Sequence, residues 1–256
     1  MRLNLPCCLL VGLSGAIPAL AQQPASLPSI TISLGLSGGV GIPFTPISPT
    51  RLEIGGISKI RTDAEAGFLS GTAKEAYSVN LFLRLAHGKW FLQPEAGYQS
   101  LLSSPVAYED DYPTGMGPNF AGPEQLHNFR SDQLMLGTLA GYYLGSEPHF
   151  YLLTGPAAGF RIGGSDYGSS RTDLGEEIRN SLNRAPETTR FFIQGGLGYG
   201  GLARHLNLEA RFIYGLTPLV RNLTFRNEKY ALKAQAHILL LTMAFTLDVK
   251  SKVASQ

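Results

Sequence analysis

A set of glutamates, arginines and glutamines that alternate with apolar or small residues is the strongest candidate for a functional site in this sequence. They are Arg84, Gln93, Glu95, Arg161, Gln194, Glu209 and Arg211. Alternation with a period of two places such residues on one face of a strand. Charges that share a narrow interior must pair, because an unpartnered buried ion costs several kcal/mol. We therefore expect a structural lumen network of ion pairs and hydrogen bonds, with a gated ion path as the alternative.

Two other stretches resemble ligand-binding motifs without the spacing that binding requires. Glu109-Asp110-Asp111 clusters carboxylates, which are ligands for hard cations, but no EF-hand spacing accompanies it. A solvated acidic loop is the expected reading. The glycine-rich run 196–201 lies inside an alternating segment and no helix follows it, so it lacks the geometry of a phosphate-binding loop. We expect no metal site and no cofactor.

Histidines next to hydroxyl residues are the remaining candidates for catalysis. His127 with Ser131, or His237 with Thr242, could in principle supply a base and a nucleophile. No nucleophile elbow or paired histidine motif is present. We therefore predict that the chain is not an enzyme, with a membrane-embedded lipid-modifying enzyme as the less favoured alternative.

Eight alternating segments predict strands that would hold these residues. They are Ile30–Ser37, Tyr77–Leu85, Trp90–Gln99, Leu134–Tyr142, Phe150–Ile162, Phe191–Gly200, Leu206–Leu216 and Leu239–Leu247. Long connections follow the first, third, fifth and seventh segments, and short turns follow the second, fourth and sixth. Within the third long connection, Asp173-Leu174-Gly175-Glu176 is typical of a capping box and predicts a short helix to about Asn183.

Strict alternation of long and short connections favours one fold over a soluble sandwich. We predict an all-β chain: an eight-stranded antiparallel up-and-down transmembrane β-barrel, over residues 29–249, with four long outer loops and three short periplasmic turns. Its apolar face would meet lipid and its polar face would fill a plugged lumen. Two aromatic girdles at the membrane interfaces are predicted at Tyr77, Trp90, Tyr98, Phe150, Tyr214 and Phe245.

The first residues carry a targeting signal. A positive start at Arg2, a short apolar core and Ala19-Leu20-Ala21 predict a signal peptide, residues 1–21, cleaved after Ala21. Residues 22–28 would then be a short lead, and residues 250–256 a polar tail. Both cysteines fall in the segment removed, which excludes disulfides from the mature chain.

Net charge and hydropathy limit the classes of partner and the ways in which the chain could span a membrane. The formal net charge of only +2 gives no field that would favour nucleic acid. The mature chain has no apolar run of about 18 residues, so a transmembrane helix is not expected.

A resemblance to a known family agrees with these expectations. The third predicted strand, Trp90-Phe91-Leu92-Gln93-Pro94-Glu95-Ala96-Gly97-Tyr98, together with the signal peptide, resembles the outer-membrane β-barrel domain proteins of Bacteroidetes-type bacteria, the porin-family or PorT-like group. The resemblance implies an eight-stranded barrel in the cell outer membrane. We expect a monomer in the lipid bilayer whose outer loops act in binding, adhesion or envelope structure, with an extracellular or envelope protein as ligand. An accessory role in envelope transport or protein secretion is the alternative.

Overall fold

A computed structural model describes residues 30–48, 51–54, 58–62, 75–110, 125–145, 150–164, 173–203 and 205–249. The predicted signal peptide (1–21), the short lead (22–28) and the polar tail (250–256) lie outside the described residues. No helix within the described part of the chain has both the length and the apolar character needed to cross a bilayer.

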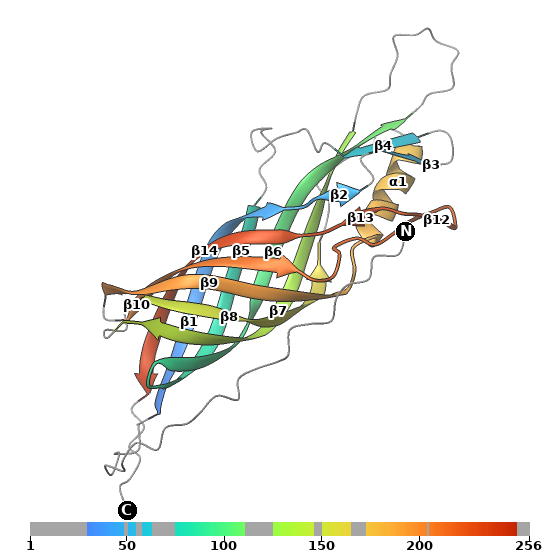
Figure 1. The fold of residues 1–256 in the computed structure, drawn as a ribbon. Coiled ribbons are helices and arrows are strands. Elements are labelled where there is room, and N and C mark those ends of the chain that lie inside the picture. Colours follow the sequence, from blue (N-terminus) through green and yellow to red (C-terminus); the bar gives the residue numbers. More distant parts are fainter. Residues whose placement is uncertain are drawn as a thin grey trace, which may run out of the picture.

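Eight antiparallel strands close into a barrel (Figure 1). In order around the wall they are β1 (Thr31–Phe44), β5 (Glu75–His87), β6 (Trp90–Asp110), β7 (Gln125–Leu144), β8 (Phe150–Gly163), β9 (Thr189–Ala203), β10 (Leu206–Gly215) and β14 (His237–Val249). Each strand pairs with the next, and β14 pairs with β1 from Ile32↔Val249 to Phe44↔His237 to close the wall. The predicted eight-stranded up-and-down barrel is therefore confirmed.

The two ends of the barrel differ in how the strands are joined. At the short-turn end, Gly88 takes a positive φ of 59° between β5 and β6, and only two residues separate β9 from β10. At the long-connection end lie β2 (Ile47–Ser48), β3 (Arg51–Ile54), β4 (Ser58–Thr62), α1 (Asp173–Arg184), β11 (Leu223–Phe225), β12 (Glu228–Tyr230) and β13 (Lys233–Ala234). The predicted helix is present as α1 and ends one residue after the predicted limit.

The strands of the barrel are longer than the sequence predicted. The predicted segments end at Gln99 and resume at Leu134, whereas β6 runs on to Asp110 and β7 starts at Gln125. The prediction failed because the alternation lapses between Leu102 and Pro105, where the pairing of β6 with β7 shifts register. β1 likewise continues past the predicted limit at Ser37, through Pro43, and reaches Phe44.

Two internal prolines are tolerated because the ladders are interrupted beside them. Pro94 lies in β6, and the pairing of β5 with β6 breaks between Phe82↔Glu95 and Leu85↔Leu92. The pairing of β7 with β8 breaks in the same way opposite Pro156. Because proline has no N–H to donate, a gap in the ladder removes the cost of placing it inside a strand.

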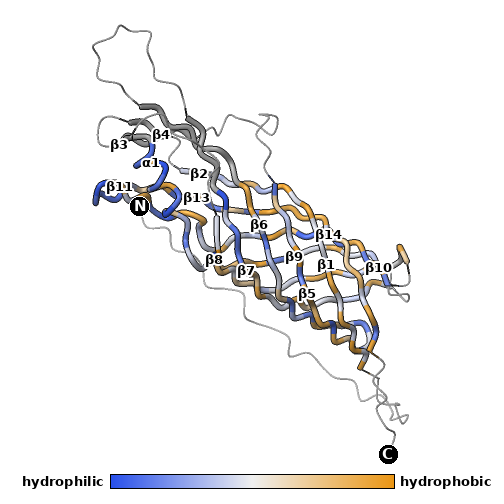
Figure 2. Tube along the Cα trace, turned by 180° about the vertical axis from the view of Figure 1, so that it is seen from behind, coloured by the Kyte–Doolittle hydropathy of each residue, from blue (hydrophilic) through white to orange (hydrophobic). Residues whose placement is uncertain are grey.

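The outer face of the wall carries exposed large apolar side chains. Along the strands, hydrophobic residues alternate with more polar ones (Figure 2). On β14 every second residue from Leu239 to Val249 is an exposed large apolar side chain. Ten residue steps of about 3.4 Å in a strand tilted by about 40° give a band about 25 Å high, the height expected for a transmembrane barrel.

Interior glycines make room for aromatic rings. A Cβ on Gly141 would lie 1.9 Å from the ring of Phe91, and a Cβ on Gly198 would lie 2.1 Å from that of Tyr151. Neither ring could keep its place beside a larger residue. The small residues on the inner faces of the strands are therefore part of how the lumen is filled.

Candidate functional site: the lumen and its cap

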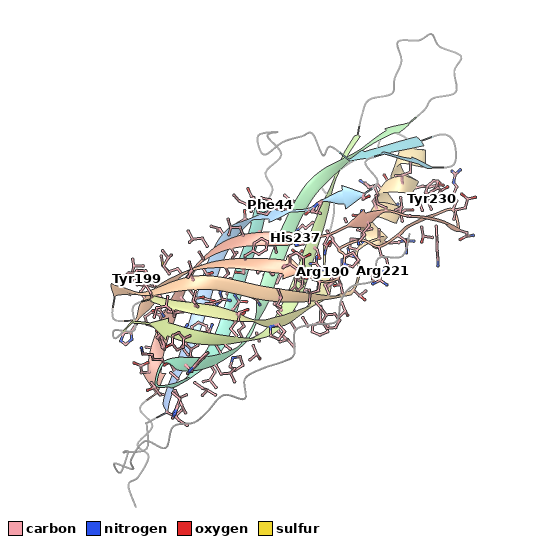
Figure 3. All side chains as sticks on the ribbon, in the orientation of Figure 1. Phe44, Arg190, Tyr199, Arg221, Tyr230 and His237 are labelled. Carbon is pink, nitrogen blue, oxygen red and sulfur yellow. The ribbon has the colours of Figure 1, made fainter. Side chains whose placement is uncertain are left out.

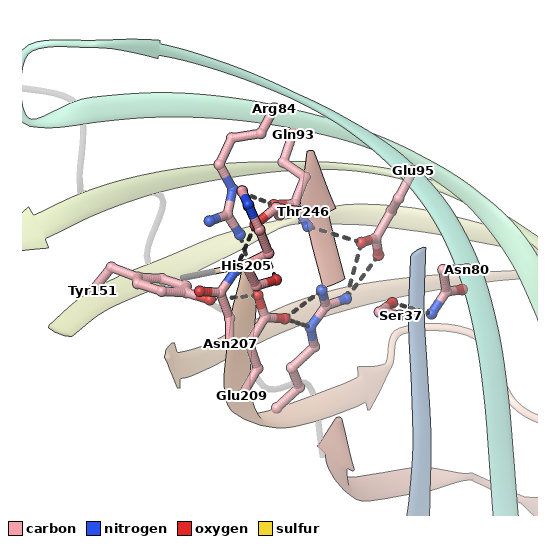
Figure 4. Close-up of polar contacts among 11 residues, drawn as sticks. Ser37, Asn80, Arg84, Gln93, Glu95, Tyr151, His205, Asn207, Glu209 and Thr246 are labelled. Carbon is pink, nitrogen blue, oxygen red and sulfur yellow. Dashed lines mark hydrogen bonds and ion pairs between the residues drawn. The ribbon is translucent and has the colours of Figure 1, made fainter. Parts of the chain in front are cut away.

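Four buried charged residues join across the lumen near the short-turn end (Figure 4). Arg84 lies on β5, Glu95 on β6, and both Glu209 and Arg211 on β10. β6 and β10 are opposite each other in the wall, so the pair between Glu95 and Arg211 spans the interior. Two positive and two negative charges balance within this group, called here the ion-pair cluster.

Glu209 is the centre of the ion-pair cluster. Its side chain is 0% exposed. Oε1 accepts hydrogen bonds from the Tyr151 hydroxyl at 2.7 Å and from Arg84 Nη2 at 3.2 Å. Oε2 accepts one from Arg211 Nε at 2.8 Å and lies 2.6 Å from Arg211 Nη2. Charge-assisted bonds of this kind satisfy a carboxylate that has lost its water.

The carboxylate of Glu95, the second acid of the ion-pair cluster, is contacted by Arg211 and by two glutamines. Arg211 Nη1 donates to both oxygens of Glu95, at 3.0 and 2.9 Å. Gln194 Nε2 donates to Oε1 at 3.3 Å, and Gln93 Nε2 lies 3.5 Å from Oε2. Gln93 also accepts from Arg84 Nε at 2.8 Å. Six of the seven residues predicted for the lumen network are thus brought together.

The seventh residue, Arg161, lies elsewhere. Its guanidinium donates to the main-chain oxygens of Asn183 at 3.0 Å, Gly163 at 3.3 Å and Pro186 at 3.4 Å. Two of these carbonyls are at the end of α1, where a positive charge interacts favourably with the helix dipole. Arg161 therefore positions α1 and does not contact the ion-pair cluster.

Aromatic side chains lie between the ion-pair cluster and the short-turn end. The Arg84 guanidinium lies over the rings of Phe91 and Tyr151, 4.5 and 4.9 Å from their centroids. Phe91 and Tyr151 pack edge to face at 5.5 Å, together with buried Leu139 and Leu153. The sequence placed Tyr151 on the inner face, but its hydroxyl bond to Glu209 joins residues 58 positions apart and has no local signal.

The long-connection end is covered by a packed apolar layer, called here the cap. It joins α1 to the chain between β10 and β14, and its fully buried members are Ile178, Leu182, Leu219, Val220, Leu223, Leu232 and Ala234. They pack on inward residues of the wall such as Leu101 and Ile238. The cap was not predicted, because its apolar residues fall in stretches without strand alternation.

A second polar group lies in the lumen on the side of the long-connection end. Arg190 of β9, labelled in Figure 3, is 2% exposed. Its Nη2 donates to Gln133 Oε1 at 2.6 Å, and Gln133 Nε2 donates to Gln99 Oε1 at 2.5 Å. The sequence analysis missed Arg190 because the predicted strand began at Phe191, whereas β9 begins at Thr189. The alternation could have identified it, because Arg190 lies two and four residues before Phe192 and Gln194 and so falls on the same face of the strand.

The predicted aromatic positions all point outward. The six residues predicted as girdles, Tyr77, Trp90, Tyr98, Phe150, Tyr214 and Phe245, are each at least 38% exposed. At the short-turn end, Trp90 packs on Tyr142 at 4.7 Å between centroids and Phe150 packs on Tyr199 at 4.8 Å. At the other end Tyr214 stacks on His237 at 4.4 Å.

Of the two candidate catalytic pairs, the one whose side chains are both described, His237 with Thr242, is not assembled. His237 lies on the outer face of β14, accepts a hydrogen bond from the Gly215 N–H at 3.3 Å and stacks on Tyr214. Thr242 is on the inner face and 0% exposed, so the two side chains point in opposite directions. The side chains of His127 and of Glu109-Asp110-Asp111 lie outside the described residues. Within the described part, no three His, Cys, Asp or Glu side chains group around a common point as a metal site would require.

Comparisons with known proteins match the geometry of the wall. A family model described as an outer membrane protein beta-barrel domain matches residues 20–221. No curated protein matches the chain at a significant level.

Solved structures similar to this chain include three bacterial surface proteins. The outer membrane protein OprG from Pseudomonas aeruginosa is 12% identical with a TM-score of 0.45, over 86% of this chain and 97% of OprG. Neisserial surface protein A is 10% identical with a TM-score of 0.34, over 85% and 98% of the two chains. Ail of Yersinia pestis, in complex with the heparin analogue sucrose octasulfate, is 11% identical with a TM-score of 0.32, over 85% and 97%.

Proposed function

The chain belongs to the outer membrane protein beta-barrel domain family, and from this premise we propose that it is a non-conducting barrel that binds a partner at its long-connection end. Its place is the outer membrane. The long connections would face the cell exterior, as the short turns of such barrels face the periplasm.

Closure of the lumen at two levels supports the absence of conduction. The pair between Glu95 and Arg211 joins opposite walls, and the buried apolar residues of the cap fill the space above. An ion would have to displace a charge-balanced network and then cross a packed apolar layer, where a charge is not solvated. The cap is the observation that carries the proposal, because a diffusion pore would leave this end open.

The exposed side of the cap supports a binding role. α1 is fixed to the turn between β11 and β12 by the ion pair of Glu177 with Arg226 at 2.8 Å, and Arg221 pairs with Glu187 at 3.5 Å. Arg226 and Asn227 hold this turn with positive φ values of 48° and 67°. Polar side chains on a fixed scaffold lose little entropy on binding, so the cap suits recognition of a polar protein surface.

We propose that the chain has no catalytic activity, because the His237 and Thr242 side chains point to opposite faces of β14. Nothing in the described residues favours the secretion-accessory role implied by the PorT-like resemblance, which stays an alternative. Copurification of a second envelope protein with the barrel would favour it.

Conduction is tested with the full chain in planar lipid bilayers. We expect no channel steps, and stable single-channel currents from the wild-type protein would refute a closed lumen.

Binding is tested with cells that display the protein. A triple variant, Arg226→Ala, Asn227→Ala and Lys229→Ala, removes exposed polar groups of the cap, whereas Lys89→Ala removes an exposed group at the short-turn end as the control. We expect the triple variant alone to lose adhesion to host cells or matrix proteins while it still shows the heat-dependent gel shift of a closed barrel. Equal adhesion of wild-type cells and cells without the protein would contradict the proposal.

A further inference from the structure

Arg190 is a buried cation for which the described residues offer no carboxylate. Among the described residues its guanidinium makes one hydrogen bond, to Gln133 Oε1, and it lies 5.1 Å from the ring centroid of Phe192. The other buried lumen arginines, Arg84 and Arg211, each pair with a glutamate. A guanidinium has five N–H donors and no acceptor, so most of the donors of Arg190 are unused by the protein.

The neighbours of Arg190 are turned to donate as well. Because Arg190 can only donate, it fixes Oε1 of Gln133 as the acceptor, and Nε2 of Gln133 must then donate to Gln99 Oε1. The amide oxygens of both glutamines are thus occupied. The amide nitrogen of Gln99 is then left as a donor.

Two buried hydroxyls on neighbouring inner-face positions have no hydrogen-bond partner among the described residues. Ser78 is directly opposite Gln99 in the pairing of β5 with β6, and Ser131 is the next inward residue before Gln133 on β7. Ser131 Oγ and Ser78 Oγ are both buried without a hydrogen-bond partner. Buried hydroxyls are normally satisfied, so their state indicates that something occupies the lumen beside them.

We propose that this donor group, formed by Arg190, Gln99, Gln133, Ser78 and Ser131, binds a small inorganic anion of the size of chloride. Such an anion supplies the missing negative charge and accepts from several donors at once. It would sit between the ion-pair cluster and the cap, and enter during folding or through transient opening of the cap.

The first test measures how anions affect stability of the purified full chain in detergent. The midpoint of the heat-dependent gel shift is followed in sodium chloride and in sodium gluconate at equal ionic strength. Because a ligand bound only to the folded state stabilises it by mass action, we expect the midpoint to rise with chloride concentration and not with gluconate. Equal midpoints in the two salts across the titration would overturn the proposal.

Matched variants locate the effect. Arg190→Gln removes the charge and should abolish the difference between the two salts, whereas Arg221→Gln, an exposed arginine near the same end, should retain it. A persistent chloride effect in Arg190→Gln would place the anion elsewhere and overturn the assignment. The wild-type protein offers an independent check should the variant not fold. In crystals grown with bromide, we expect anomalous density within hydrogen-bond distance of the Arg190 guanidinium, and a site occupied only by water would refute the proposal.

Discussion

Neutralising Glu209 should destabilise the barrel strongly. The carboxylate is fully buried and is contacted by Arg84, Tyr151 and Arg211. In Glu209→Gln the ion-pair cluster keeps two arginines and one glutamate. The amide nitrogen introduced by the substitution is a donor. It would lie against the guanidinium groups of Arg84 and Arg211, which can only donate, or against the Tyr151 hydroxyl, which donates to Glu209 in the wild-type protein. Removing one partner of a buried pair costs about 3–5 kcal/mol. We expect a loss of this size in the free energy of unfolding.

The assay is urea titration of the protein folded into lipid vesicles, read by the heat-dependent gel shift. Glu228→Gln, an exposed carboxylate of the cap, is the matched control and should change stability by less than about 0.5 kcal/mol. Combining Glu209→Gln with Arg84→Gln restores charge balance. The double variant should therefore lose at least about 1 kcal/mol less than the sum of the two single variants. Additive losses, or a Glu209→Gln variant within about 1 kcal/mol of wild type, would refute the electrostatic account of the lumen.

Three further predictions test the cap, the packing of the lumen and the girdles. Leu182→Ala should destabilise the packing of the cap by about 2–5 kcal/mol. Amide hydrogen exchange in α1 should then be faster, while the gel shift of the barrel persists. Unchanged exchange in α1 would contradict the packing of the cap. Gly141→Ala should destabilise the barrel by about 1–3 kcal/mol, because the added Cβ would meet the ring of Phe91. Gly38→Ala, whose Cβ would have its nearest atom 4.0 Å away, should leave the stability unchanged. Equal stability of the two variants would contradict the tight packing of the lumen. Trp90, the single tryptophan, should be quenched most by bromines attached near the headgroups, and strongest quenching from the bilayer centre would exclude an interfacial girdle.

The wall of the barrel could be predicted from the sequence because alternation is a local signal. Leu81 and Phe82, for example, differ in exposure from 61% to 2%, as their positions in the pattern require. The same alternation predicted that Glu95 and Glu209 lie on the inner faces of their strands. Their direct bridging through Arg211 follows from closure of the barrel, since a β6 residue and a β10 residue can meet only when the wall curves round.

The cap and the Arg190 group could not be predicted because they depend on contacts between segments without a common period. Leu219, Val220 and Leu223 follow neither a strand nor a helix pattern, and their burial is determined by α1, which comes from a different long connection. Arg161 shows that strand alternation predicts the face on which a residue lies but not the contacts that it makes. It has the inward position of a lumen residue, yet it lies beyond the ion-pair cluster and reaches the end of α1 instead.

The length of β6 and β7 has a further consequence for what can reach this protein on a cell. A bilayer is crossed by about 9–11 residues of a tilted strand, whereas β6 has 21 and β7 has 20. Roughly half of this ribbon therefore stands clear of the lipid, with β4 paired along it and α1 lower beside it (Figure 1). The rim is tall on one flank and low on the other. A large molecule that approaches the membrane from this side would therefore meet the raised ribbon before the shorter flank.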